Sequence, residues 1–425
     1  GSHNHSSARG AVTALGLTEP ALEVSDMVVT GNLTLSSTGS VKLPVGTTAQ
    51  RPSTVYDVGM LRYNSTLNAV EVYKPDGWGQ MAAVVPLYSF TTHTFTHANA
   101  SGAPNTGPTL TECRNAYNVS WDMDTSLFNM TTQGIQLWTV PETASYTIVA
   151  KGASGGAYGN TSGTNPGFPG GGATMTATFD LTQGTILNIV VGQKPSSQST
   201  SQYSASPGGG ASWVYTGDIV AGGSLLMVAG GGGGTGHGSS SSTAGNGRGG
   251  NSGTDSLESS SSAAVGSGSN ARTGTGSAGN KGIGEGGRGT STYSNNYGGS
   301  GGGAGWKSDG NDDESGGGSS GNDKGFGGDR FVGGLGATNA APYPWDWRGG
   351  FGGGGGVGGS IGAGGGGGGY TGGGGGQGWN NVSWGGGGGG GSYIDSTGTN
   401  TTKTAGTDAI DQNAVHHGYV TITKI

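Results

Sequence analysis

The sequence predicts an all-β protein: a jelly-roll-like sandwich with a large inserted bundle of polyglycine II helices, preceded by a small separate β module. Glycine supplies 100 of the 425 residues, and only 31% of the chain is hydrophobic. Because glycine is unfavourable inside an α-helix, this composition excludes a helical bundle. Short alternating apolar and polar runs, spaced about ten residues apart, are typical of a sandwich. The glycine runs follow no collagen-like triplet.

The first 85 residues predict a separate β module. Residues 1–10 are set aside as a tag or disordered end, since they begin Gly-Ser-His. Residues 11–85 have ordinary composition and form the neck. Its strands are expected at 30–35, 41–46, 59–64, 69–73 and after the turn 76–79. Such a small unit buries too little apolar surface to be stable alone, so we expect it to associate with copies of itself.

Residues 86–425 predict one glycine-rich head. Its strands are expected at 135–140, 145–150, 174–181, 185–191, 224–229 and 419–425. The long gap before the last strand makes the glycine-rich segment an insertion between strands of one sandwich, or a layer packed on it. We therefore assign 86–229 and 391–425 to the sandwich and about 230–391 to the insertion.

The inserted segment has two interpretations. A glycine-rich chain can be a flexible linker. It can also form a lattice of extended three-residue-per-turn helices, whose N–H and C=O groups are satisfied only by neighbouring chains and which only glycine can pack closely enough. Five tryptophans stand among these glycines, and a closing strand follows them. These two features favour the packed lattice.

A resemblance to a known module lies within residues 28–83. The stretch LPVGTTAQRPSTVYDVGMLRYNSTLNAVEVYKPDGWGQM, residues 43–81, resembles the short β module near the distal ends of tailed-phage fibres. The residues that carry the match are Pro44, Gly46, Thr47, Arg51, Pro52, Gly59, Met60, Arg62, Tyr63, Asn64, Gly77 and Trp78. The resemblance implies a structural module on a trimeric fibre.

The head, from about residue 90 to 425, resembles the glycine-rich extracellular domain of the anaplastic lymphoma kinase and leukocyte tyrosine kinase receptors. Matching stretches include TECRNAY (111–117), GIQLWTVPETASYTIVAKGASGG (134–156), ILNIVVGQ (186–193), GGGASWVY (208–215), LLMVAGGGGG (225–234), GGGAGW (301–306), WDWRGGFGGGGG (345–356), GGGGGGYTGG (364–373) and HGYVTI (417–422). The resemblance implies a sandwich with inserted polyglycine helices that binds protein ligands. Receptor signalling is not expected, because Cys113 has no internal disulfide partner and no kinase or membrane-spanning segment follows.

Motifs for chemistry are weak. The GxGxxG matches at 245–250 and 282–287 follow no clear strand, so no nucleotide site is expected. Asp309, Asn311 and Asp313 have the spacing of a Ca²⁺ loop that lacks its later glycine and glutamate, and a solvated acidic loop is the alternative. The adjacent pair His416–His417 is poorly placed for one metal ion, since neighbours on a strand face opposite ways. Cys113 is expected to be a buried thiol. We expect no cofactor and no enzyme.

Aromatic residues divide into two groups. Those within the receptor-like stretches are expected to pack as lids over the glycine bundle: Trp306, Trp345, Trp347 and Phe351. The others, with two asparagines, are expected to contact a receptor from loops: Tyr293, Tyr297, Tyr343, Trp379, Asn380, Asn381 and Trp384.

The expected function is host attachment. The chain would be a distal tail-fibre protein of a virus, and a bacteriophage is the expected source. Its heads would form a homotrimer that binds a host cell-surface glycan or protein multivalently. It would be located on the virion. The alternative is a secreted or cell-surface ligand-binding protein. A net charge of −7 disfavours nucleic acid, and no apolar run is long enough to cross a membrane.

Overall fold

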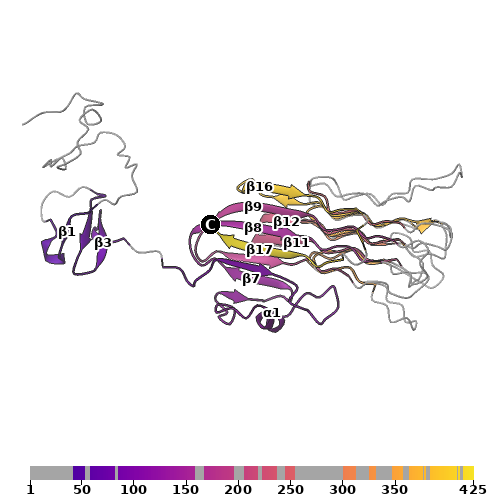
Figure 1. Ribbon diagram of the computed structural model, residues 1–425, viewed down its shortest axis with the longest axis horizontal. Coiled ribbons are helices and arrows are strands. Elements are labelled where there is room, and N and C mark those ends of the chain that lie inside the picture. The colour runs from indigo at the N-terminus through magenta and orange to yellow at the C-terminus, as the bar shows by residue number, and fades with distance from the viewer. Residues whose placement is uncertain are drawn as a thin grey trace, which may run out of the picture. The chain divides into compact units, whose positions relative to one another are not determined.

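The computed structural model describes residues 42–52, 58–81, 85–157, 167–195, 205–218, 223–236, 245–253, 300–312, 325–331, 347–357, 363–376, 378–379, 383–408, 410–411 and 415–425. The chain divides into two compact units, Gly1–Ala83 and Val84–Ile425, and each is considered by itself. Several of their elements are labelled in Figure 1.

The neck is a four-stranded sheet in the order β1-β2-β3-β4. Its strands are β1 (Val45–Gly46), β2 (Leu61–Asn64), β3 (Ala69–Lys74) and β4 (Gly77–Gln80), and a 3₁₀ turn, η1, spans Thr48–Gln50. β1 runs parallel to β2, while the other pairs are antiparallel. The hairpin expected from 59–64 and 69–73 is therefore confirmed. The strand expected at 30–35 lies outside the described residues.

The head is built on two sheets, and the predicted all-β sandwich is confirmed. One sheet has the order β16-β9-β8-β17-β5, from strands β5 (Thr92–Phe95), β8 (Ala144–Lys151), β9 (Thr174–Leu181), β16 (Thr399–Thr404) and β17 (Tyr419–Lys424). The other has the order β15-β12-β11-β10-β7-β6, from strands β6 (Phe128–Asn129), β7 (Ile135–Thr139), β10 (Ile186–Val190), β11 (Ser212–Thr216), β12 (Ser224–Ala229) and β15 (Tyr393–Ile394). All pairs in both sheets are antiparallel.

The core lies between the two sheets. Phe95, Ile148 and Met175 face it from the first sheet and are fully buried. Trp138 and Ile189 meet them from the second sheet and are also fully buried. The six head strands expected from alternation are confirmed as β7, β8, β9, β10, β12 and β17, because alternate residues reach this core.

One helix, α1 (Leu110–Tyr117), packs against this core, and the sequence prediction missed it. Its N-terminus is a capping box: Thr109 Oγ1 accepts from Glu112 N at 3.2 Å, and Thr109 N donates to Glu112 Oε2 at 2.7 Å. Asn118 ends the helix in the left-handed conformation. Cys113 is its buried residue, and the expected buried thiol is confirmed. Burial raises the pKa of Cys113 to about 12.

The glycine segments are hydrogen-bonded to one another. In residues 364–370, each N–H donates to a different segment from the N–H before it, and the same neighbour returns every third residue. Gly364, Gly367 and Tyr370 donate to Gly385, Gly388 and Gly391; Gly365 and Gly368 donate to Ser206 and Gly209; Gly366 and Gly369 donate to Gly301 and Ala304. Segments 152–156, 170–173 and 205–210, which precede the expected insertion, also take part. This glycine array therefore includes connections between sandwich strands, and it continues along the axis of the strands in Figure 1.

Candidate functional site

Two of the predicted contact residues lie in a small hairpin that joins two segments of the glycine array. Trp379 lies in β13 (Gly378–Trp379) and Trp384 in β14 (Ser383–Trp384), paired as Gly378 with Trp384 and Trp379 with Ser383. The flanking glycine Gly376 donates to Gly364 at 2.7 Å, so the array holds the base of the hairpin. The remaining predicted contacts lie outside the described residues: Tyr293, Tyr297, Tyr343, Asn380 and Asn381.

Two of the predicted lids, Trp306 and Phe351, form a third layer on the outer face of the six-stranded sheet. Trp306 stacks on Trp213 of β11 with ring centroids 6.0 Å apart. Phe331, which the sequence did not single out, stacks on Tyr215 at 5.3 Å. Phe351 is 1% exposed in the same cluster. These rings therefore attach the glycine array to the sandwich.

Of the other two predicted lids, Trp347 packs in a separate small cluster. Trp347 is 7% exposed and packs with Ala205 and Val357, between array segments. Trp345 lies outside the described residues.

The first of the predicted Ca²⁺ residues, Asp309, lies beside the turn that holds Asp329 and Arg330. Asp309 Oδ1 accepts from Arg330 N at 2.9 Å and is 3.6 Å from Arg330 Nε. Burial, and then the charges of Asp309 and Asp312, raise the pKa of Asp329. Asn311 takes part through its backbone carbonyl, which accepts from Gly302 N. Asp313 lies outside the described residues, and within them no group of three His, Cys, Asp or Glu side chains is arranged to hold a metal ion.

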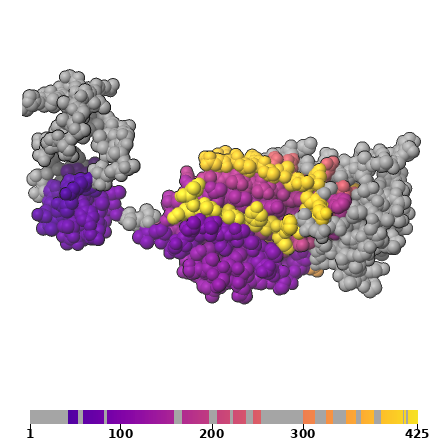
Figure 2. Space-filling view, viewed as in Figure 1, coloured from indigo at the N-terminus to yellow at the C-terminus, as the bar shows by residue number. Residues whose placement is uncertain are grey.

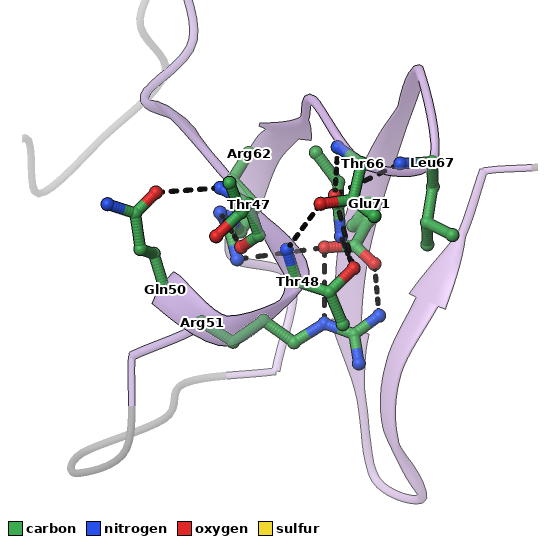
Figure 3. A network of polar contacts seen from close by, with 9 residues as sticks. Thr47, Thr48, Gln50, Arg51, Arg62, Thr66, Leu67 and Glu71 are labelled. Atoms are coloured by element: carbon green, nitrogen blue, oxygen red, sulfur yellow. Dashed lines mark hydrogen bonds and ion pairs between the residues drawn. The ribbon is translucent and has the colours of Figure 1, made fainter.

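The neck holds a buried polar network on one face of its sheet (Figure 3). Glu71 is fully buried and pairs with Arg51, whose Nε is 3.4 Å from Glu71 Oε2. Arg62, 5% exposed, approaches the same carboxylate at 3.8 Å and donates to Thr47 O at 2.9 Å. The hydrogen bond from Arg51 is the main cause that lowers the pKa of Glu71. Asn64, also fully buried, lies on this face of β2.

The opposite face of the neck sheet is apolar. Val45 pairs with Tyr63 in register, and Leu61 pairs with Val72, so these side chains share one face. Val45 is 60% exposed and Leu61 is 44% exposed. The module thus buries its charges and exposes its aliphatic side chains, the reverse of a stable monomer. We call this surface, made of Val45, Leu61, Tyr63, Val70 and Val72, the apolar neck face.

Two histidine environments in the head were not predicted. His93 is surrounded by Phe95, Tyr117 and Trp121, with ring centroids 4.5 to 5.0 Å away, and burial lowers its pKa to about 4. His417 stacks in parallel on His97 at 3.7 Å, and burial lowers its pKa to about 3. The sequence gives no signal for either environment, because each depends on a distant partner: Tyr117 and Trp121 for His93, and His97 for His417.

The described helix is too short to cross a membrane, and no other helix in the described residues is long enough. A cavity of about 300 Å³ lies where the five-stranded sheet meets the glycine array. Its lining includes Lys151, Thr174, Thr407 and His416, together with the glycines Gly171, Gly172 and Gly406.

These features define an all-β protein with a glycine-rich head and a small β neck. No protein-family model matches the chain. The chain is 38% identical over 102 residues to the leukocyte tyrosine kinase receptor of Mus musculus. That similarity covers 24% of this chain and 11% of the receptor, so the chain matches about a tenth of its relative's length.

Proposed function

We propose that this protein is the distal attachment part of a viral tail fibre, in which the neck associates three copies and the head contacts the host surface. The apolar neck face is the observation that carries the proposal. A sheet of this size with one aliphatic face uncovered gains stability when another copy covers that face. The resemblance of residues 43–81 to a tailed-phage fibre module supports three copies.

We further propose that the array segments are polyglycine II helices. The three-residue recurrence of the hydrogen bonds of 364–370 supports this, because that helix has three residues per turn and no internal hydrogen bonds. A side chain on Gly366 would place its Cβ within 3.0 Å of backbone atoms of Gly373 and Gly303. Such an array would hold the β13–β14 hairpin rigidly, so that little conformational entropy is lost when the loops contact a receptor.

In this proposal, attachment is multivalent and non-covalent. Three heads on one neck raise the effective concentration of each head at a surface, so weak single contacts add to firm adhesion. The protein would be located on the virion, with a host glycan or protein as its partner, and it would have no catalytic role.

The test is the sedimentation of the intact chain and of the variant Leu61→Asn. We expect the unmodified chain to sediment as a trimer at micromolar concentration, and L61N to shift toward monomer because it places an amide on the apolar neck face. The matched control is Leu87→Asn, since Leu87 is 50% exposed in the head unit. A monomeric unmodified chain would reject the proposal.

A second candidate function is a secreted or cell-surface ligand-binding protein, and the match to a receptor tyrosine kinase favours it. A monomer that binds a soluble protein ligand would support this function instead.

A further inference from the structure

The outer face of the five-stranded sheet carries rows of threonines. One row crosses all five strands at paired positions: Thr92, Thr423, Thr147, Thr178 and Thr399. The next row holds Thr94, Thr421, Val149, Thr176 and Thr402. Neither row contains a charged residue. Figure 2 shows the strands of this sheet side by side, with β16 in yellow at the upper edge and β17 in yellow near the middle.

A third row leads into the cavity described above. Lys151 pairs with Thr174, which pairs with Thr404, and this is the last row before the glycine array begins. Lys151 and Thr174 line the cavity together with Thr407. Gly171, Gly172 and Gly406 also line it, so part of its wall is bare backbone, and Ile410 borders that wall with its Cγ2 3.3 Å from where a Cβ on Gly171 would lie.

The polar groups of this cavity call for an anionic, hydroxyl-bearing ligand. No carboxylate lines it, and the Lys151 ammonium makes no ion pair or hydrogen bond with any described residue. The nearby Asp408 is already engaged, by Arg248 at 3.0 Å and by Gly249 N at 2.6 Å. The hydroxyls of Thr174 and Thr407 also have no partner in the described part of the chain. A volume of about 300 Å³ is at the small end of ligand sites and suits one or two sugar rings.

We propose that this cavity binds a uronic-acid residue of an acidic polysaccharide. The sugar carboxylate pairs with Lys151, its hydroxyls bond to Thr174 and Thr407, and the adjoining sugars lie over the threonine rows. The inference rests on the proposed attachment function and names the chemical class of the host receptor. The cation selects the acidic sugar, because a neutral sugar would leave Lys151 desolvated without a counter-ion.

The experiment is a calorimetric titration of the full chain with an oligogalacturonate and with its methyl ester, which keeps the rings but removes the charge. We expect the oligogalacturonate to bind and the ester to bind at least about tenfold more weakly. Lys151→Gln should weaken oligogalacturonate binding by a similar factor. Lys403→Gln is the matched control, because Lys403 is an exposed lysine on β16 that pairs with the core residue Met175 and does not line the cavity.

Three results would overturn the proposal: no binding of the oligogalacturonate, equal binding of acid and ester, or equal effects of K151Q and K403Q. Thr174→Val provides a second variant that keeps the shape of the side chain, and it should also weaken binding. Unfolding midpoints of all variants show whether each head remains folded. Each head carries its own cavity, so a monomeric chain that still binds oligogalacturonate would reject the trimeric fibre while leaving this site intact.

Discussion

The ring of Phe351 lies against Gly134 so closely that no side chain fits between them. A Cβ on Gly134 would lie within 3.0 Å of Cζ, Cε1 and Cε2 of Phe351. Phe351 belongs to the glycine array, and Gly134 directly precedes β7 of the six-stranded sheet. The same ring also closes over Gly107. This contact is one of the points where the array and the sandwich become a single packed body.

The first prediction concerns that contact. Gly134→Ala should lower the free energy of unfolding by about 2–4 kcal/mol, because it adds steric overlap with Phe351 to the cost of a left-handed alanine. Gly184→Ala is the control, since Gly184 has φ +82° against +86° at Gly134, but a Cβ there meets nothing within 4 Å. It should cost only about 1–2 kcal/mol. Urea denaturation measures both losses, and equal losses would contradict the proposed role of Phe351.

The glycine array gives the second prediction. Gly366→Ala should separate array segments and leave buried backbone groups unpaired, at about 1–3 kcal/mol for each group. Gly253→Ala should be close to neutral, because the nearest atom to an added Cβ there is 3.9 Å away. Thermal unfolding distinguishes the two variants. If G366A has the same unfolding midpoint as the unmodified protein, the segments around residue 366 are not closely packed.

The strands could be predicted from the sequence where one face is buried. β8 and β9 alternate over eight residues because every second side chain enters the core. β16 was missed, since all six of its residues are exposed at a sheet edge and leave no apolar pattern. The signal for α1 was present: Thr109 and Glu112 have the spacing of a capping box.

The candidate sites could be predicted only in part. Glycine segments carry no side chains that mark a register, so the pairing of 364–370 with 385–391 could not be derived from the sequence. Val45 and Leu61 were visible as apolar residues of neck strands. That Arg51 turns back over Glu71 and leaves the aliphatic face uncovered depends on tertiary structure.

The third prediction concerns the buried carboxylate of the neck. Glu71→Gln removes the counter-charge of Arg51 and Arg62 and should destabilise the neck by about 3 kcal/mol, the usual cost of breaking a buried pair. Hydrogen exchange of the amides of β2 and β3 should accelerate correspondingly. The control is Glu142→Gln, which breaks the partly exposed pair between Glu142 and Lys424 in the head. It should cost less than about 1 kcal/mol. Unchanged exchange in E71Q would show that the network does not stabilise the neck.

The last prediction is a loss of head stability in mild acid. The pKa of His93 is lowered to about 4 and that of His417 to about 3, so both stay neutral in the folded head below pH 6.5, where an unfolded histidine gains a proton. The unfolded state then binds more protons, and stability falls with decreasing pH. Each histidine should contribute a slope of up to about 1.4 kcal/mol per pH unit.

The measurement is the free energy of unfolding between pH 6.5 and 5, a window above the range where unfolded carboxylates titrate. In the unmodified head, Nδ1 of His417 accepts a hydrogen bond from Lys194 N at 3.4 Å. His417→Asn offers an amide oxygen as acceptor in its place. This variant should reduce the slope of stability against pH by the contribution of one histidine. His93→Gln should do the same. Stability at pH 8, where both histidines are neutral in both states, gives the packing cost of each variant separately. A slope that is the same in H417N as in the unmodified chain would show that the His97–His417 stack accepts protons while folded.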